Sequence, residues 1–198
     1  MFAEEFDLQV KNLLNKGYPD LAGISQDDFV KELEPLKEKL SGLPQDSSFL
    51  IVVRESLIPA EKMMEAVERE GKKGFTVISP EDLAGFTPIP GVLLPEGNFY
   101  LILNVDTGEE TLNVTPDAAL ITILGKSHSP LTIAEGVAVV THKPGLLQKN
   151  HCFSLPGSRC GDKRVAAIWI SDSRPKLGWC WAGNPHTWLG SASCSKRI

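Results

Sequence analysis

The sequence lacks the long apolar segment that a membrane-spanning helix needs. Its 198 residues are 42% hydrophobic, yet no apolar run approaches the ~20 residues required to cross a bilayer. The first ten residues carry acids where a secretory signal peptide has basic residues followed by an apolar stretch. We therefore expect no membrane association and a cytoplasmic location, in which the four cysteines are reduced thiols.

The short motifs of several enzyme and metal-site classes are also missing. The chain has no CxxC pair for a zinc ribbon, no GxGxxG or Walker loop for phosphate, and no GxSxG elbow for a serine nucleophile. The acidic pI near 5.4 argues against a dedicated nucleic-acid binder, although residues 143–198 carry a net positive charge. These absences argue against sites of those classes that are built on a short motif.

Hydrophobic periodicity predicts an α+β fold that begins with a helical N-terminal segment, residues 1–44. A pair of amphipathic helices is expected there, and Ser25 with Asp28 forms a capping pair that would open the second helix. Residues 45–198 form the α+β domain proper. We expect the two parts to pack together as one compact unit.

The middle of the chain predicts a central mixed sheet. Short apolar runs at 49–53 and 75–78 have the composition of buried strands, and a helical pattern lies between them. Strand, helix and strand in this order predict a βαβ unit with a right-handed crossover. Further along, Thr132 and Glu135 form a capping box that predicts another helix.

The tail of the chain predicts a β-hairpin with loops rich in cysteine and tryptophan. Two alternating segments, 165–170 and 177–182, are separated by the turn residues SDSRP. Because side chains alternate along a strand, we expect Trp179 and Trp181 on one face of the hairpin and Cys180 on the other.

Side chains capable of chemistry are concentrated in this same tail. All four cysteines, all four tryptophans and two of the four histidines lie between positions 151 and 194. One local environment therefore holds most of the reactive and recognition-competent groups, and we expect any site to lie there. The cysteines are Cys152, Cys160, Cys180 and Cys194, and the tryptophans are Trp169, Trp179, Trp181 and Trp188.

Four stretches of the chain resemble an uncharacterised family of actinobacterial proteins, classed as a domain of unknown function. The resemblance covers nearly the whole chain and implies a bacterial cytoplasmic protein, but it brings no reaction, ligand or site residue. The stretches are KGYPDLAG (16–23), SPLTIAEG (129–136), NHCFSLPGSRCGDKRV (150–165) and KLGWCWAGNPHTWLGSASC (176–194).

The leading interpretation is a module that binds a small molecule or a protein partner. Tryptophans in or beside a Gly/Pro-rich loop, together with a few polar groups, are typical of a ligand pocket and also of a protein interface. Trp169, by contrast, is expected to close the core of the sheet. The predicted ligand-binding residues are Trp179, Trp181, Asn184, His186, Trp188 and Arg159.

A thiol-dependent enzyme is the alternative from another class. Cys160 or Cys152 would be the nucleophile, and His151 or His186 would be the base. Basic residues surround Cys160 in the segment GSRCGDKR, so we expect them to lower the pKa of its thiol.

A zinc site without a classical motif is the third possibility, and zinc is the one cofactor considered. Successive cysteines lie eight, twenty and fourteen positions apart, which gives no knuckle that would pre-organise two ligands. The ligands would have to come from separate loops. The candidate set is Cys152, Cys160, His186 and Cys194.

Overall fold

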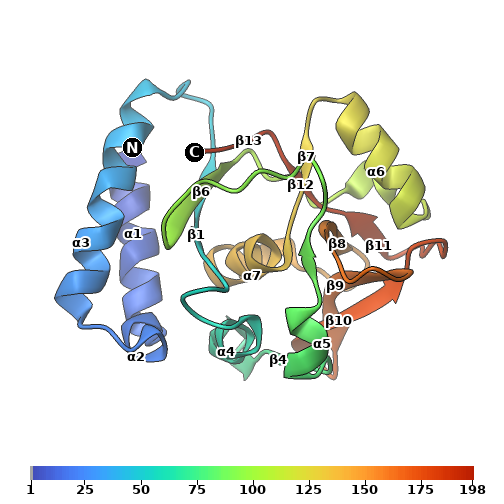
Figure 1. Cartoon of the computed structure of the whole chain (residues 1–198), viewed down its shortest axis with the longest axis horizontal. Coiled ribbons are helices and arrows are strands. Elements are labelled where there is room, and N and C mark those ends of the chain that lie inside the picture. The colour runs from blue at the N-terminus through green and yellow to red at the C-terminus, as the bar shows by residue number, and fades with distance from the viewer. Residues whose placement is uncertain (1) are drawn as a thin grey trace.

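A computed structural model describes residues 2–198, and its mixture of helices and sheets confirms the α+β class. In Figure 1 the N-terminal helices stand on one side, the C-terminal sheet on the other, and α7 lies between them. Among residues 2–198 no helix is long and apolar enough to span a bilayer. The helices are α1 (Phe2–Asn15), α2 (Tyr18–Ala22), α3 (Gln26–Lys39), α4 (Ala60–Ala66), α5 (Pro80–Ala84), α6 (Pro116–Gly125) and α7 (Ile133–His142), with 3-10 turns η1 (Leu40–Gly42), η2 (Glu109–Thr111) and η3 (Pro144–Leu146).

The strands form two main sheets and two short pairs. One sheet has the order β1-β6-β13, and the larger one has the order β11-β8-β9-β10-β4, with β5 paired to β8. The larger sheet is mixed, as expected, because β4 and β11 pair in parallel with their neighbours. The strands are β1 (Phe49–Val53), β2 (Glu68–Arg69), β3 (Lys72–Lys73), β4 (Phe75–Thr76), β5 (Thr87–Pro88), β6 (Phe99–Leu103), β7 (Ser129–Pro130), β8 (Cys152–Arg159), β9 (Arg164–Ser171), β10 (Arg174–Trp181), β11 (Leu189–Ser191), β12 (Ser193–Cys194) and β13 (Lys196–Arg197).

The prediction of a βαβ unit is wrong. Strand β1 pairs antiparallel with β6, whereas β4 pairs with β10 in the other sheet. After α4 the chain turns through the β2-β3 hairpin before it reaches β4, so the helix does not return the chain to the sheet of β1. An apolar run indicates that a strand is buried on both faces, but it does not identify the neighbouring strand.

The N-terminal helices form as their sequence signals predict. Helix α3 begins after Ser25, whose side chain accepts a hydrogen bond from the backbone N–H of Asp28. Helix α1 buries Phe6, Val10 and Leu13, and these side chains belong to the same apolar cluster as the strands of both sheets. A single continuous core therefore joins the helical segment to the rest of the chain.

The free edge of β1 is closed by side chains instead of by another strand. The Gln9 side chain donates from Nε2 to the carbonyl of Phe49 at 3.0 Å and accepts from the N–H of Ile51 at 2.9 Å. The Nε2 of His142 lies 3.0 Å from the Ile51 carbonyl, and burial lowers the pKa of this imidazole to about 4. A neutral His142 therefore donates from Nε2, and α1 and α7 together satisfy the backbone groups of an edge strand.

Helix α7 begins at a buried ion pair that also holds the end of the chain. The predicted pairing of Thr132 with Glu135 is present, and the Glu135 carboxylate accepts a hydrogen bond from the backbone N–H of Thr132 at 2.7 Å. The Glu135 carboxylate additionally binds the guanidinium of Arg197 at 2.5 and 2.8 Å and accepts from the Tyr100 hydroxyl at 2.9 Å. Because both partners are buried, removal of either charge is expected to cost about 3–5 kcal/mol.

Candidate functional site

The C-terminal hairpin forms as predicted and divides the tryptophans between its two faces. Strands β9 and β10 pair antiparallel, and their turn places Asp172 and Ser173 at φ values of 52° and 62°, as a tight type I′ hairpin turn requires. Trp169 lies opposite Lys176 on one face. Trp179 and Trp181 belong to the other face, which confirms the predicted alternation.

The face that carries Trp169 borders a cavity of about 610 Å³, a size usual for a small-molecule site. The rings of Trp169 and Trp188 lie 6.4 Å apart at 60°, and the His186 ring lies 5.2 Å from that of Trp188. None of the lining residues, all within 2–198, is acidic. They are Lys149, Asn150, Cys152, Trp169, Ile170, Thr187 and Trp188.

Gly178 explains why the Trp169 ring can lie along the sheet. A Cβ atom at position 178 would come within 2.3 Å of Trp169 Cη2, so only glycine leaves room for the ring. The Lys176 ammonium lies 5.0 Å from the centre of the same ring, within cation–π range. Trp169 thus packs against the core, as expected, and also lines the cavity, which was not expected.

The lysine side chains near this cavity have no acidic partner within residues 2–198. Among residues 2–198, neither Lys149 nor Lys176 belongs to an ion pair. The Cys152 thiol lines the cavity and points back to the carbonyl of Gln148 at 3.3 Å. Burial raises the pKa of this thiol, so at neutral pH Cys152 contributes a neutral, weakly polar group.

The opposite face carries an exposed aromatic pair. The rings of Trp179 and Trp181 meet edge to face at 4.8 Å, and these residues are 36% and 47% exposed. The Arg164 guanidinium lies 5.9 Å from the Trp179 ring. It also binds Asp162 at 2.8 Å and Asp82 at 3.2 Å, so its charge is already balanced.

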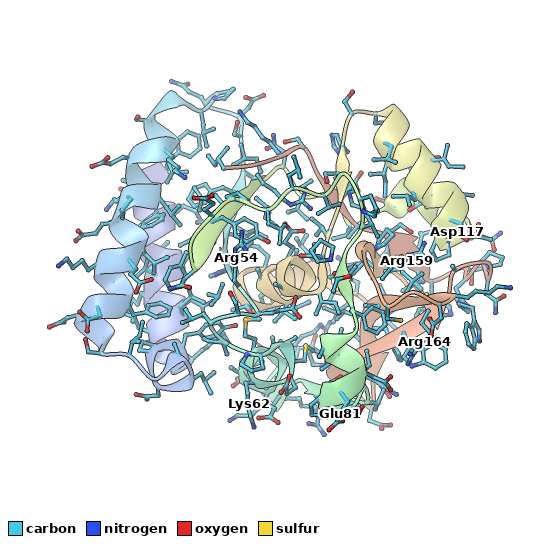
Figure 2. All side chains as sticks on the ribbon, viewed as in Figure 1. Arg54, Lys62, Glu81, Asp117, Arg159 and Arg164 are labelled. Atoms are coloured by element: carbon cyan, nitrogen blue, oxygen red, sulfur yellow. The ribbon has the colours of Figure 1, made fainter. Side chains whose placement is uncertain are left out.

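The charge of Arg159 is likewise balanced by an acidic side chain. Its guanidinium binds Asp117 at 2.6 Å, and Figure 2 shows the two residues near the first turn of α6, with Arg164 below them. The predicted ligand-binding residues are therefore split. His186 and Trp188 lie at or beside the cavity, whereas Trp179, Trp181 and Arg159 belong to other surroundings. Asn184 is exposed in the turn that follows Trp181, where its N–H binds the Trp181 carbonyl.

The expectation of an acidic thiol at Cys160 is wrong. Burial raises the pKa of this thiol, and a 3.2 Å hydrogen bond from Sγ to Asp162 raises it further. Arg164 acts in the opposite direction but is itself bound to Asp162. Basic neighbours in the sequence therefore do not lower the pKa of this thiol, because its sulfur is hydrogen-bonded to an acid of the same loop.

Among residues 2–198 no cysteine sulfur is hydrogen-bonded to a histidine ring. Burial raises the pKa of Cys180 to about 11 and that of Cys194 to about 12. The sulfur of Cys152 is directed to a backbone carbonyl, and His151 is held by backbone bonds with Gln148. His186 packs its ring against Trp188.

The four candidate zinc ligands do not meet. Cys152 begins β8 and Cys160 follows its last residue, and at ~3.3 Å per residue the strand separates them by roughly 25 Å. Cys194 lies on β12, which pairs with β7 in a separate two-stranded sheet. Among residues 2–198 no three His, Cys, Asp or Glu side chains are grouped so that they could hold a metal ion.

Sequence reasoning did not select five of the cavity residues as site residues: Lys149, Asn150, Trp169, Ile170 and Thr187. Asn150 and Thr187 each stand next to a residue that was selected, and Lys149 is two positions from His151, but none of the five belongs to a recognisable motif. The sequence did offer one signal for this part of the sheet. Gly178 pairs with the strand that carries Trp169, and a glycine inside a strand often marks a position where another group packs closely against the backbone.

Comparisons with known proteins give a family and no more. A family model described as Family of unknown function (DUF5701) matches residues 12–198, which is most of the chain. No curated protein matches, and no solved structure does either.

Proposed function

Because the chain belongs to DUF5701, a family of unknown function, we propose its function from the site: it binds a small aromatic anion in the cavity between Trp169 and Trp188. The observation that carries this proposal is a cavity of about 610 Å³ that is lined by two indole rings and by Lys149, with a second ammonium group, that of Lys176, 5.0 Å from the centre of the Trp169 ring. An aromatic ring of the ligand would contact the indoles, and its anionic group would lie beside Lys149 and Lys176.

The aromatic part of the ligand follows from the two rings. At 60° and 6.4 Å the indoles do not stack on each other, and both line the cavity, where a third ring would contact them. Edge and face contacts between aromatic rings contribute about 0.5–1.5 kcal/mol each beyond area burial.

The anionic part follows from the charges. Lys149 lines the cavity, Lys176 covers the Trp169 ring, and the lining contains no carboxylate. Two opposite unit charges about 4 Å apart attract each other by about 1 kcal/mol in bulk water and by about 4 kcal/mol near a protein surface. A neutral thiol at Cys152 supports binding over thiol catalysis, and the proposed binding requires neither a metal nor a cofactor.

We place this binding protein in the cytoplasm of a bacterium, and specifically of an actinobacterium. All four cysteines are free thiols, which suits a reducing compartment. The bacterial setting is supported by the resemblance of the four sequence stretches named above.

The test is isothermal titration calorimetry with 2-naphthoate and, as a neutral match, 2-naphthamide. Trp188→Ala should weaken naphthoate binding about fivefold, which corresponds to one aromatic contact of ~1 kcal/mol. Trp179→Ala, on the opposite face, is the matched control and should leave binding unchanged. Lys149→Met should lower the affinity for naphthoate and leave the affinity for naphthamide unchanged. Unchanged binding in Trp188→Ala, or loss in Trp179→Ala, would overturn the proposal.

A further inference from the structure

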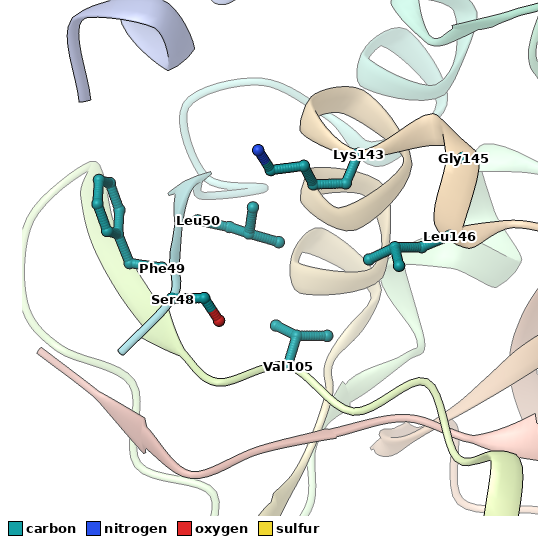
Figure 3. A pocket seen from close by; sticks show the side chains of 7 residues that line it. All are labelled: Ser48, Phe49, Leu50, Val105, Lys143, Gly145 and Leu146. Carbon is teal, nitrogen blue, oxygen red and sulfur yellow. The ribbon is translucent and has the colours of Figure 1, made fainter. Parts of the chain in front are cut away.

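A second cavity lies on the far side of α7 from the hairpin, at the beginning of β1. Its volume is about 460 Å³, and Figure 3 shows it between β1, the segment that follows β6, and η3. Most of its lining is apolar, and one basic side chain stands among the apolar ones. The lining residues are Ser48, Phe49, Leu50, Val105, Lys143, Gly145 and Leu146.

Three aliphatic side chains converge on the interior. Leu50, Val105 and Leu146 point toward one another in Figure 3, each from a different segment. Phe49 points away toward α1, where its ring meets those of Phe2 and Phe6 at 6.2 and 6.4 Å. The space is therefore bounded by flexible aliphatic groups and suits an alkyl chain better than a rigid aromatic ring.

Lys143 provides a cation at the rim. It follows the last residue of α7, and its ammonium binds the Glu5 carboxylate at 2.7 Å. The two side chains are 47% and 34% exposed, and an exposed ion pair of this kind contributes little to stability. A carboxylate that arrives with an apolar chain can replace Glu5 at little cost, because Glu5 keeps its bond to Gln9.

A smaller polar cavity of about 250 Å³ adjoins this one, and Lys143 lines both. Lys16 and Asn12 belong to its lining, and the imidazole of His142 there is neutral because burial lowers its pKa to about 4. Apolar and polar spaces thus meet at one ammonium group, which is the arrangement that an amphiphilic anion requires.

We propose that this cavity binds a medium-chain aliphatic carboxylate, with its chain among Leu50, Val105 and Leu146 and its head group on Lys143. The site is separate from the tryptophan-lined cavity and does not depend on the function proposed for it. Charge complementarity at Lys143 selects the acid over the corresponding alcohol, and the apolar lining selects longer chains until the cavity is filled.

The test is calorimetric titration of the full chain with hexanoate, octanoate and decanoate, with decan-1-ol as the neutral match. Affinity should rise roughly fourfold for each added methylene, which corresponds to ~0.8 kcal/mol per buried CH₂. Lys143→Gln should remove the preference of decanoate over decanol. Lys62→Gln, which alters an exposed lysine paired with Glu65, is the matched control and should bind like the wild type.

Leu146→Ser is a second variant, and because Leu146 is 40% exposed the protein should keep its fold. It should lower the affinity for decanoate and spare 2-naphthoate. Because every tryptophan lies outside this cavity, decanoate should leave tryptophan emission unchanged. Affinity that does not depend on chain length, or decanoate binding that quenches tryptophan and is lost in Trp188→Ala, would overturn the proposal.

Discussion

The two faces of the C-terminal hairpin carry the same aromatic residue in different surroundings. On one face the chain returns after β10, and Trp188 lies against Trp169 over a cavity. On the other face Trp179 and Trp181 contact each other and stay 36% and 47% exposed. Strand alternation decides which side chains share a face. What covers that face depends on segments that are distant in the sequence.

The two faces also differ in how their cations are balanced. Beside the exposed pair, Arg164 is bound to Asp162 and Asp82. Beside the cavity, Lys149 and Lys176 have no ion-pair partner within residues 2–198. The covered face therefore combines a concave apolar surface with uncompensated positive charge, and this combination is what favours it as the binding face.

In the comparison of the two hairpin faces, the largest expected effect comes from filling the space that Gly178 leaves for Trp169. Gly178→Val should lower the free energy of unfolding by about 2–3 kcal/mol, because the new side chain displaces the indole ring. It should also abolish 2-naphthoate binding. Urea denaturation followed by circular dichroism measures the first effect, and calorimetry measures the second.

Gly183→Val is the matched control for this change. A Cβ atom at position 183 meets nothing within 4 Å, so the free energy of unfolding should change by no more than about 0.5 kcal/mol. Equal losses of stability in the two variants would show that the Trp169 ring does not depend on Gly178.

A smaller effect is expected when one tryptophan is removed from each face. Trp188→Ala should lower the free energy of unfolding by about 2 kcal/mol, because the side chain is partly buried against Trp169 and His186. Trp179→Ala should cost about half as much, since its ring is more exposed and has Trp181 and Arg164 beside it. Chemical denaturation of both variants measures the difference, and a larger loss in Trp179→Ala would reverse the comparison.

Local sequence signals predicted where helices, caps and hairpins form more accurately than which strands pair with one another. The caps at Ser25 and Thr132 and the hairpin face of Trp179 were confirmed because each depends on residues a few positions apart. The βαβ unit failed because the partner of β1 is β6, about fifty residues further along the chain. The residues of a short apolar run do not indicate which distant strand it will pair with.

The cavity that we propose as the binding site lies in the region to which the sequence pointed, but most of its lining differs from the predicted residues. The cavity is in the Cys/Trp-rich tail, yet it uses Trp169 and Lys149 where Trp179 and Arg159 were expected. Arg159 is bound by Asp117, which lies 42 positions earlier in the sequence. The sequence shows a charged residue but not the partner that neutralises it, so free and balanced cations look alike until the fold is known.

The smallest expected effect concerns Cys160, which is hydrogen-bonded to Asp162, the acid that binds Arg164 beside the exposed tryptophan pair. Asp162→Asn removes the charged acceptor of the Sγ hydrogen bond, so the pKa of Cys160 should fall toward its ordinary value and more thiolate should be present at pH 8. Alkylation by iodoacetamide should become roughly two- to threefold faster. The Cys180 thiol, on the covered face, should stay unreactive at pH 8 in both proteins, because burial raises its pKa to about 11. Mass spectrometry of the alkylated peptides separates the two cysteines, and an unchanged rate at Cys160 would mean that burial alone controls that thiol.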